Sequence, residues 1–336
     1  MSSGQSANQQ AGHRASRPHV AIISPAMANA NNGNWQTASR WARFLEPDCR
    51  VSLLPAWQGE ACDALIALHA RRSAPSIFEF ASACPTLPLV TVLTGTDLYR
   101  DILDDDDAKR SLALSTRLVV LQEDGLRRLD PLLRGKTTVI YQSAPALPPI
   151  EASERSREVI MIGHLREEKC PQTFMQAAER VTAPGVAMIH VGGALEPELG
   201  KRAEATARRL PHYRWLGNLP HDQTRERLRR SLAMAIASRM EGGANVIIEA
   251  VTSGVPVLAS DIPGNRGMLG DGYAGYFPPG DSAALARLID RVAADDAFLA
   301  LLRAQCAARA GLFAPERERA ALRQLLDNLI FPDPAR

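Results

Sequence analysis

The sequence has few cysteines, no long apolar run and almost no excess of charge of either sign. Its five cysteines are scattered and form no CxxC pair, which excludes a zinc ribbon or redox dithiol and favours a reduced, cytoplasmic setting. The 39 basic and 37 acidic residues leave a formal net charge of +2, which excludes a mainly electrostatic nucleic-acid binder. No run approaches the roughly 18 apolar residues that span a bilayer, so we expect no membrane partner.

Two common nucleotide-binding and catalytic signatures are also missing. The chain contains no GxxxxGK(S/T), no HExxH and no short internal repeat. We therefore expect no metal and no bound cofactor. Residues 1–17 are rich in Ser, Gln, Asn, Gly and Ala without an apolar core, which predicts a flexible tail and not a secretory signal.

Short apolar runs separated by helix-like segments fill the rest of the chain. Continuous runs of this kind are typical of a parallel sheet with helices on both faces. In the first half the runs are HVAIIS, VSLLP, ALIAL, PLVTVLT, RLVVLQ and TTVIYQ, with helices expected at 35–45, 76–83 and 124–133. In the second half they are EVIMIG, VAMIHVGG, YRWLG, LAMAIAS, VPVLAS and AGYFPPG, with helices expected at 171–181, 197–210, 223–231, 282–294 and 296–309.

The proline-rich segment APALPPIE divides these two alternations. We predict an α/β protein with two doubly wound, Rossmann-like parallel-sheet domains and a cleft between them. Residues 1–17 would be the tail, 18–147 the acceptor-side domain and 148–312 the donor-side domain. Residues 313–336 would form an amphipathic helix that braces both domains, because leucines recur there at helical spacing.

The stretch Ser238–Asn265 carries the densest chemistry. Glu241 and Glu249 flank a Gly-Gly-Ala-Asn turn, and a helix beginning near Asn245 would present free N–H groups to an anion. The two glycines would let a ligand approach the main chain. The spacing of Glu241 and Glu249 corresponds to at most about 12 Å of helical rise. This distance suits groups at the two ends of a sugar nucleotide. Alternatively, both acids are solvated charges at a helix start.

Polar side chains also follow predicted strands of the first domain, where ligands of parallel sheets gather. His69 and Arg71 follow ALIAL, and the sequence Thr94–Asp97 follows PLVTV. His69 is either a phosphate ligand or a structural histidine. Gly33 and Asn34 enter a helix, as a phosphate site or as a plain turn with an Asn cap.

Asp97 has three possible roles in the Thr-Gly-Thr-Asp sequence. It caps the following helix, orients Arg100 or touches a donor hydroxyl. The sequence alone leaves all three open.

Three spaced motifs in the second domain resemble family-4 glycosyltransferases of the GT-B fold. EGGANVIIE followed by SGVPVLASDIPGNRG resembles their E-x7-E region, and GHLREEK at 163–169 resembles their G-x-L-x-x-x-K phosphate turn. Leu216 with Gly217 is similar to the Leu-Gly that precedes their base-binding loop. The resemblance covers nearly the whole second domain.

That resemblance implies roles for the charged residues. Glu249 would hold the donor ribose and Glu241 the donor hexose, while Lys169 and Arg166 would compensate the charge of the leaving diphosphate. The alternative for Lys169 and Arg166 is a solvated helical turn paired with its neighbouring glutamates. The family often has Gly-Arg in this turn, whereas here His164 follows Gly163; His164 either bonds phosphate or is structural.

The first domain departs from ordinary family-4 enzymes, which carry His-Gly where this chain has Thr-Gly-Thr-Asp. VTVLTGTDLYRDI, NNGNWQTA and GHLREEK together resemble the selenosugar synthases of selenoneine biosynthesis. This resemblance implies transfer of an N-acetylglucosaminyl or glucosyl group from a UDP-sugar to the selenium of selenophosphate. An acceptor that is already an anion needs positioning more than deprotonation.

We thus predict a hexosyltransferase whose substrates are a UDP-sugar and selenophosphate. One alternative is a family-4 enzyme that acts on a carbohydrate or lipid-linked hydroxyl, and another is a sugar-nucleotide sensor without turnover. The predicted catalytic residues are Lys169, Arg166 and Glu241. The predicted donor-binding residues are Gly163, His164, Gly217, Asn218, Ser238, Gly242, Gly243, Ala244, Asn245 and Glu249. The predicted acceptor-binding residues are Gly33, Asn34, His69, Arg71, Thr94, Gly95, Thr96 and Asp97.

Overall fold

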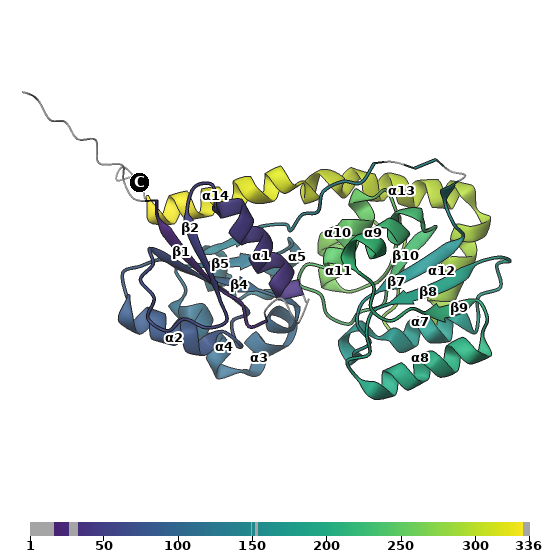
Figure 1. Cartoon of the computed structure of the whole chain (residues 1–336), viewed down its shortest axis with the longest axis horizontal. Coiled ribbons are helices and arrows are strands. Elements are labelled where there is room, and N and C mark those ends of the chain that lie inside the picture. Colours follow the sequence, from purple (N-terminus) through teal and green to yellow (C-terminus); the bar gives the residue numbers. More distant parts are fainter. Residues whose placement is uncertain (1–16, 27–32, 149, 152–153, 332–336) are drawn as a thin grey trace, which may run out of the picture.

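A computed structural model describes residues 17–26, 33–148, 150–151 and 154–331. The chain forms two α/β units that lie side by side, and a helical segment runs along both of them (Figure 1). The expected tail at 1–17 lies almost wholly outside the described residues.

The first sheet has the order β2-β1-β3-β4-β5-β6, and all its pairs are parallel. All five residues of β1, β3 and β4 are buried, because helices cover both faces. The strands are β1 His19–Ile23, β2 Arg50–Leu54, β3 Ala64–Leu68, β4 Leu89–Leu93, β5 Arg117–Val120 and β6 Thr137–Val139. The helices are α1 Gly33–Leu45, α2 Ala74–Ala83, α3 Ile102–Asp104, α4 Asp106–Leu114, α5 Asp124–Arg128 and α6 Pro131–Arg134, with a π-helical turn at Asp97–Asp101.

The second sheet has the order β12-β11-β10-β7-β8-β9 and is also parallel. Its strands are β7 Glu158–Ile162, β8 Ala187–Val191, β9 Tyr213–Trp215, β10 Ala233–Ile236, β11 Val257–Ser260 and β12 Tyr276–Phe277. Its helices are α7 Pro171–Ala178, α8 Pro197–Arg209, α9 His221–Arg230, α10 Asn245–Thr252, α11 Pro263–Leu269, α12 Ser282–Ala294 and α13 Asp296–Ala310. The predicted fold class is therefore confirmed, and the predicted boundary at 147/148 falls between β6 and β7.

Local element predictions fail where a helix is short. The helix expected at 124–133 is two helices, α5 and α6, because Asp130 caps a new helix that starts at Pro131. Helices α4 and α11 were not predicted. The first lies in an acidic segment, and the second begins at a proline and contains two glycines.

The last helix, α14 Pro315–Ile330, returns from the second unit to the first. Its leucines Leu322, Leu325 and Leu326 join the core that lies between the first sheet and α1. Glu318, which is 1% exposed, accepts hydrogen bonds from Arg40 and from Trp41 Nε1 at 2.8 and 2.7 Å. The expected amphipathic helix thus packs on the first domain.

The segment Asp296–Ile330 also contains one 18-residue window with a mean hydropathy of 1.3. By length and composition alone, this window is apolar enough to cross a membrane. The 28% of this window that is buried includes Phe298, Leu299 and Leu302 of α13, which pack in the core of the second domain.

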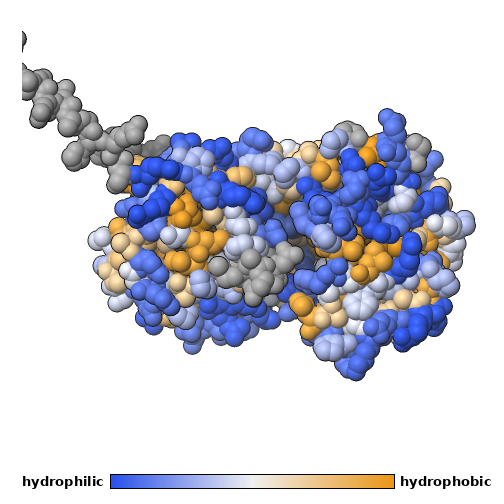
Figure 2. Space-filling view, in the orientation of Figure 1, coloured by the Kyte–Doolittle hydropathy of each residue, from blue (hydrophilic) through white to orange (hydrophobic). Residues whose placement is uncertain are grey.

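The two domains contact each other directly. The hydroxyl of Tyr141 donates to the carbonyl of Gly267 at 3.0 Å, and the ring of Tyr141 meets that of Phe313 edge-on at 5.9 Å. Hydrophobic residues on the visible face are interspersed with hydrophilic ones, and the surface dips between the domains (Figure 2).

Candidate active site

The predicted donor motifs follow the two strands at the centre of the second sheet. The turn 163–169 follows β7, and the loop 238–244 follows β10, its direct neighbour. The strand order reverses between these two strands, and ligands of doubly wound sheets bind at such a point. The main-chain N–H of Arg239 donates to the carbonyl of Glu168 at 2.9 Å, so the two segments are tied together.

Lys169 and Glu241 form an ion pair, with Nζ and Oε1 2.5 Å apart. The two side chains are 19% and 9% exposed, so both are largely removed from water. Lys169 does not pair with its neighbouring glutamates, which rules out the solvated-turn alternative for this residue. Lys169, a predicted phosphate-binding cation, therefore directly contacts Glu241, the predicted hexose ligand.

Glu249 lies in the second turn of α10, which begins at Asn245 as predicted. No side chain caps this helix at its N-cap residue, Ala244, so its first N–H groups point to the site without a side-chain acceptor. Glu249 Oε1 accepts a hydrogen bond from His221 Nε2 at 2.7 Å. This hydrogen bond raises the pKa of His221.

His164 lies beside the two predicted phosphate cations. Burial, helped by Arg166 and Lys169, lowers the pKa of His164, so its imidazole is neutral near pH 7. Its Nδ1 accepts the N–H of Gly193 at 3.2 Å, and the proton of the neutral ring therefore lies on Nε2. Arg166 is half-buried and makes no ion pair with any residue that the structure describes. Both side chains can therefore donate to an anion.

The glycines of the 241–245 loop are packed against the first domain. A Cβ on Gly242 would lie 2.5 Å from the amide nitrogen of Gly95, and a Cβ on Gly243 would lie 2.7 Å from Gln142 Oε1. We expected these glycines to admit a ligand to the main chain. In this structure the missing side chain of Gly242 makes room for the backbone of Thr94 and Gly95, and that of Gly243 makes room for the side chains of Gln142 and Leu121.

The N-terminal ends of two helices, one from each domain, lie near each other. A Cβ on Gly33, the first residue of α1, would lie 3.9 Å from Asn245 Nδ2 at the start of α10. Helix N-termini carry partial positive charge, so this arrangement favours an anion between the domains. The preceding residues 27–32 lie outside the described part of the chain.

Asp97 accepts hydrogen bonds from three backbone N–H groups. Those of Ala70 and Thr94 lie 2.9 and 3.3 Å from its Oδ2, and that of Arg71 lies 3.4 Å from its Oδ1. The bond from Thr94 caps the helical turn that begins at Gly95, as one of the three predicted roles requires. The second role is contradicted, because Arg100 pairs with Asp101 at 2.8 Å.

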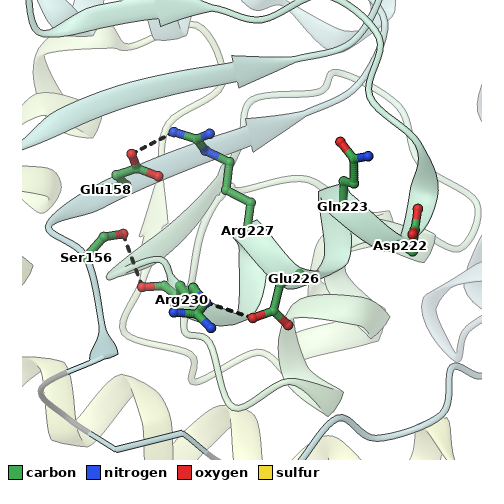
Figure 3. Close-up of a pocket in the computed structure, with 7 residues that line it drawn as sticks. All are labelled: Ser156, Glu158, Asp222, Gln223, Glu226, Arg227 and Arg230. Atoms are coloured by element: carbon green, nitrogen blue, oxygen red, sulfur yellow. Dashed lines mark hydrogen bonds and ion pairs between the residues drawn. The ribbon is translucent and has the colours of Figure 1, made fainter.

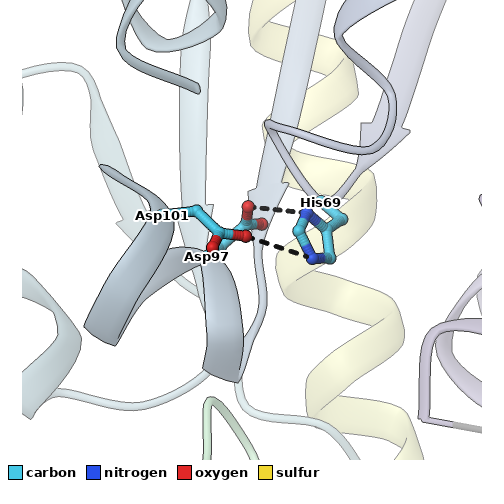
Figure 4. Close-up of side chains that lie close together, drawn as sticks. All are labelled: His69, Asp97 and Asp101. Atoms are coloured by element: carbon cyan, nitrogen blue, oxygen red, sulfur yellow. Dashed lines mark ion pairs between the residues drawn. The ribbon is translucent and has the colours of Figure 1, made fainter. Parts of the chain in front are cut away.

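His69 lies between Asp97 and Asp101 (Figure 4). Its Nδ1 is 2.7 Å from Asp97 Oδ1, and its Nε2 is 3.1 Å from Thr96 Oγ1. The three titratable groups are close enough to be considered as metal ligands. Two ligands on one ion stand about 3 Å or more apart when each bond is about 2.0–2.2 Å long, so the 2.7 Å contact is a hydrogen bond.

The other predicted site residues occupy supporting positions. Arg71 contacts Asp105 at 2.9 Å and Asp101 at 3.7 Å, so this expected anion-binding cation already has acidic partners. Ser238 is buried and accepts the Ser260 hydroxyl at its carbonyl. Gly217 accepts the N–H of Gly192 at 2.8 Å, and the Asn218 side chain lies over Gly193.

Sequence reasoning missed several residues of the site. His221 belongs to a polar helix with no motif, and Asp101 lies in a π-helical turn that no pattern predicts. Gln142, the last residue of the run TTVIYQ, was assigned no role; its Oε1 is buried without a hydrogen-bond partner among the described residues.

A pocket beside α9 lies elsewhere (Figure 3). It has a volume of about 570 Å³ and is lined by Ser156, Glu158, Asp222, Gln223, Glu226, Arg227 and Arg230. Arg227 pairs with Glu158 and Arg230 with Glu226, both at 2.7 Å. None of the predicted site residues lines this pocket, so we place the site at the motif residues.

Comparison with known proteins assigns the second domain. Residues 146–311 match the family described as "Glycosyl transferases group 1". Phosphatidyl-myo-inositol mannosyltransferase of Mycobacterium leprae is 36% identical over 121 residues, which is 35% of this chain and 29% of that protein. Glycosyltransferase 1 domain-containing protein 1 of Xenopus tropicalis is 30% identical over 112 residues, 33% of this chain and 32% of that protein. The matched region thus spans about a third of these curated relatives.

Solved structures resemble nearly the whole chain. Sucrose-phosphate synthase of Thermosynechococcus elongatus has a TM-score of 0.77 and 16% identity, covering 94% of this chain and all of that one. Anabaena HepE in complex with UDP-glucose has a TM-score of 0.74 and 16% identity, covering 93% of this chain and all of that one. This likeness establishes the GT-B fold for both domains together.

Proposed function

We propose that this chain transfers a hexosyl group from a UDP-sugar. The proposal starts from its second domain, which matches the group 1 glycosyltransferases. One observation carries the proposal. Lys169 and Glu241, from motifs 72 residues apart, form a largely buried pair where the first domain contacts the second. The curated relatives and HepE support a sugar-nucleotide donor, since their names specify glycosyl transfer and UDP-glucose.

The donor would lie along the N-terminal end of α10. Glu249 would accept the ribose hydroxyls, and Glu241 would accept hexose hydroxyls while Lys169 fixes its orientation. Negative charge grows on the diphosphate as the glycosidic bond breaks. Lys169, Arg166 and the Nε2–H of His164 would compensate that charge, and such preorganised donors account for a large share of catalysis. The chemistry uses the UDP-sugar as a substrate and needs no further cofactor.

For the acceptor, the proposed substrate is selenophosphate, on the resemblance of the first-domain motifs to selenosugar synthases. Support comes from the position of α1, whose N-terminal end faces that of α10. A selenium nucleophile on an anion would be held by these helix ends near the anomeric carbon. The preferred donor would be UDP-N-acetylglucosamine or UDP-glucose.

A hydroxyl acceptor is the second candidate, and a specific feature favours it. His69, backed by Asp97, contacts the hydroxyl of Thr96 beside the donor loop. A hydroxyl must lose its proton as it attacks, and a positioned base assists that step. The mannosyltransferase relatives also favour a more general acceptor class.

We further propose a cytoplasmic location with small-molecule partners only. All five cysteines are free thiols, three of them buried, which suits a reducing compartment. Neither nucleic acid nor a membrane is required by the proposed chemistry.

The test is the mass spectrum of products from purified protein with mixed UDP-sugars. One arm contains selenophosphate and the other contains monosaccharides and glycerol. A selenium-containing hexose with release of UDP supports the selenosugar assignment. A product from the hydroxyl arm alone would replace that assignment, and no UDP release in either arm would refute a transferase.

A further inference from the structure

A buried histidine of the first domain links the hydroxyl of a half-buried threonine to two acids. His69 is 1% exposed, and Asp97 and Asp101 are 0% and 4% exposed. Its Nδ1 contacts Asp97 Oδ1 at 2.7 Å, and its Nε2 contacts Thr96 Oγ1 at 3.1 Å. Hydroxyl, imidazole and carboxylate therefore lie in series, which is the order of a nucleophile-activating triad.

Two unusual backbone features hold this arrangement. His69 has a φ of 71°, the left-handed region that non-glycine residues rarely adopt. The π-helical turn Asp97–Asp101, in which the N–H of Ile102 reaches the carbonyl of Asp97, brings both aspartates to the imidazole. Such strained segments gather at functional sites because the surrounding structure must hold them in place.

The outer end of the series lies beside the donor loop. Thr96 is half-buried and follows Gly95, where a Cβ would lie 3.3 Å from Glu241 Cα. Glu241 is the proposed hexose ligand, so the anomeric carbon would lie on this side of the cleft. An acceptor that attacks it must pass close to the Thr96 hydroxyl.

We propose that Thr96, His69 and Asp97 form a proton relay that takes the proton from the attacking atom of the acceptor. This inference rests on the proposed hexosyl transfer. Thr96 would touch the acceptor, and His69 and Asp97 would act through it. The acceptor therefore carries an O–H or Se–H group at the attacking atom.

The step balances without any co-reactant. The acceptor proton moves to Thr96 Oγ as the Thr96 hydrogen moves to His69 Nε2. The electron pair of the broken acceptor bond stays on the acceptor atom, which bonds to the anomeric carbon, while the pair of the glycosidic bond leaves on UDP. The imidazolium formed lies between Asp97 and Asp101 Oδ2, which is 3.8 Å from Nε2 and has no hydrogen-bond partner among the described residues.

The experiment compares Thr96→Val, which removes the hydroxyl and keeps the shape, with Thr96→Ser, which keeps the hydroxyl. UDP release is measured with the full chain, UDP-N-acetylglucosamine or UDP-glucose, and selenophosphate or glycerol as acceptor. The relay predicts that Thr96→Val lowers kcat about 100-fold while KM for the donor changes less than about threefold. Thr96→Ser should restore most of the loss, and the melting temperatures of both variants should match that of the wild type.

The acceptor arms identify the atom that loses the proton. A fall in kcat with selenophosphate points to Se–H, and a fall with glycerol points to O–H; either supports the relay. Equal kcat for Thr96→Val and the wild type in every productive arm would overturn the relay and leave the transferase intact. If the wild-type chain releases no UDP in any arm, the proposed function fails and the relay fails with it.

Discussion

Gly95 of the first domain and Gly242 of the second pack main chain against main chain. A Cβ on Gly242 would lie 2.5 Å from Gly95 N and 2.7 Å from the carbonyl carbon of Thr94. The loop after β4 and the loop after β10 therefore touch beside Glu241, the proposed hexose ligand. Closure of this kind excludes water from a transfer site.

Substitution of Gly242 by Ala should keep the domains from closing. We expect UDP binding to persist and kcat to fall about 10-fold or more, because the atoms in the way are backbone and cannot rotate aside. Steady-state kinetics with small-angle scattering checks both effects. Gly272→Ala is the control, since its Cβ would meet nothing within 4 Å. A fully active Gly242→Ala protein would contradict the importance of this contact.

Replacement of Lys169 by Met should separate chemistry from stability. The variant leaves Glu241, whose side chain is 9% exposed, without its cation. We expect kcat to fall about 100-fold or more and the free energy of unfolding to fall by about 1–3 kcal/mol. The double variant Lys169→Met, Glu241→Gln should recover stability but not activity. Recovery of activity as well would refute a direct role for Lys169.

The His221–Glu249 hydrogen bond predicts a pH-dependent stability. The hydrogen bond raises the pKa of His221 in the folded protein above its value in the unfolded chain. Its contribution to the free energy of unfolding is therefore complete below the unfolded-state pKa and is lost as the pH rises through the folded-state pKa. The difference in melting temperature between wild type and His221→Gln should therefore be larger at about pH 5.5 than at about pH 9. A difference that is constant or grows with pH would contradict this pairing.

Docking of α14 should contribute strongly to stability. Leu322 is 0% exposed in the first-domain core, and its truncation to Ala should cost about 2–5 kcal/mol. Leu132→Ala is the matched control, because Leu132 is 89% exposed and its loss should change little. Denaturant unfolding measures both. If both variants lower the free energy of unfolding equally, docking of the last helix does not depend on Leu322.

The architecture was largely predictable from local patterns. Buried parallel strands are continuous apolar runs, and the helix predicted near Asn245 begins at that residue because a turn of small residues precedes it. The helices that failed are short and depend on caps or tertiary packing. Helix α11, for example, uses Gly264 and Gly267 to approach Glu241 and Gln122, which no local pattern reveals.

The site was predictable by residue type but not by pairing. The sequence identified Lys169 and Glu241, yet only the strand order of the second sheet brings residues so distant in sequence together. His221 carries no motif and was missed. The double glycine at 242–243 was predicted to give a ligand access to the main chain, whereas in the structure it packs against the first domain. A missing side chain leaves room for a ligand or for a neighbouring loop, and the sequence does not distinguish the two.

Calorimetric titration with UDP tests the central claim most directly, that the donor binds at Lys169, Glu241 and Glu249. The account predicts one UDP per chain and at least about tenfold weaker binding by Glu249→Ala. Arg227→Ala, in the pocket beside α9, should bind UDP as the wild type does. Unchanged binding by Glu249→Ala, or weakened binding by Arg227→Ala alone, would contradict the account.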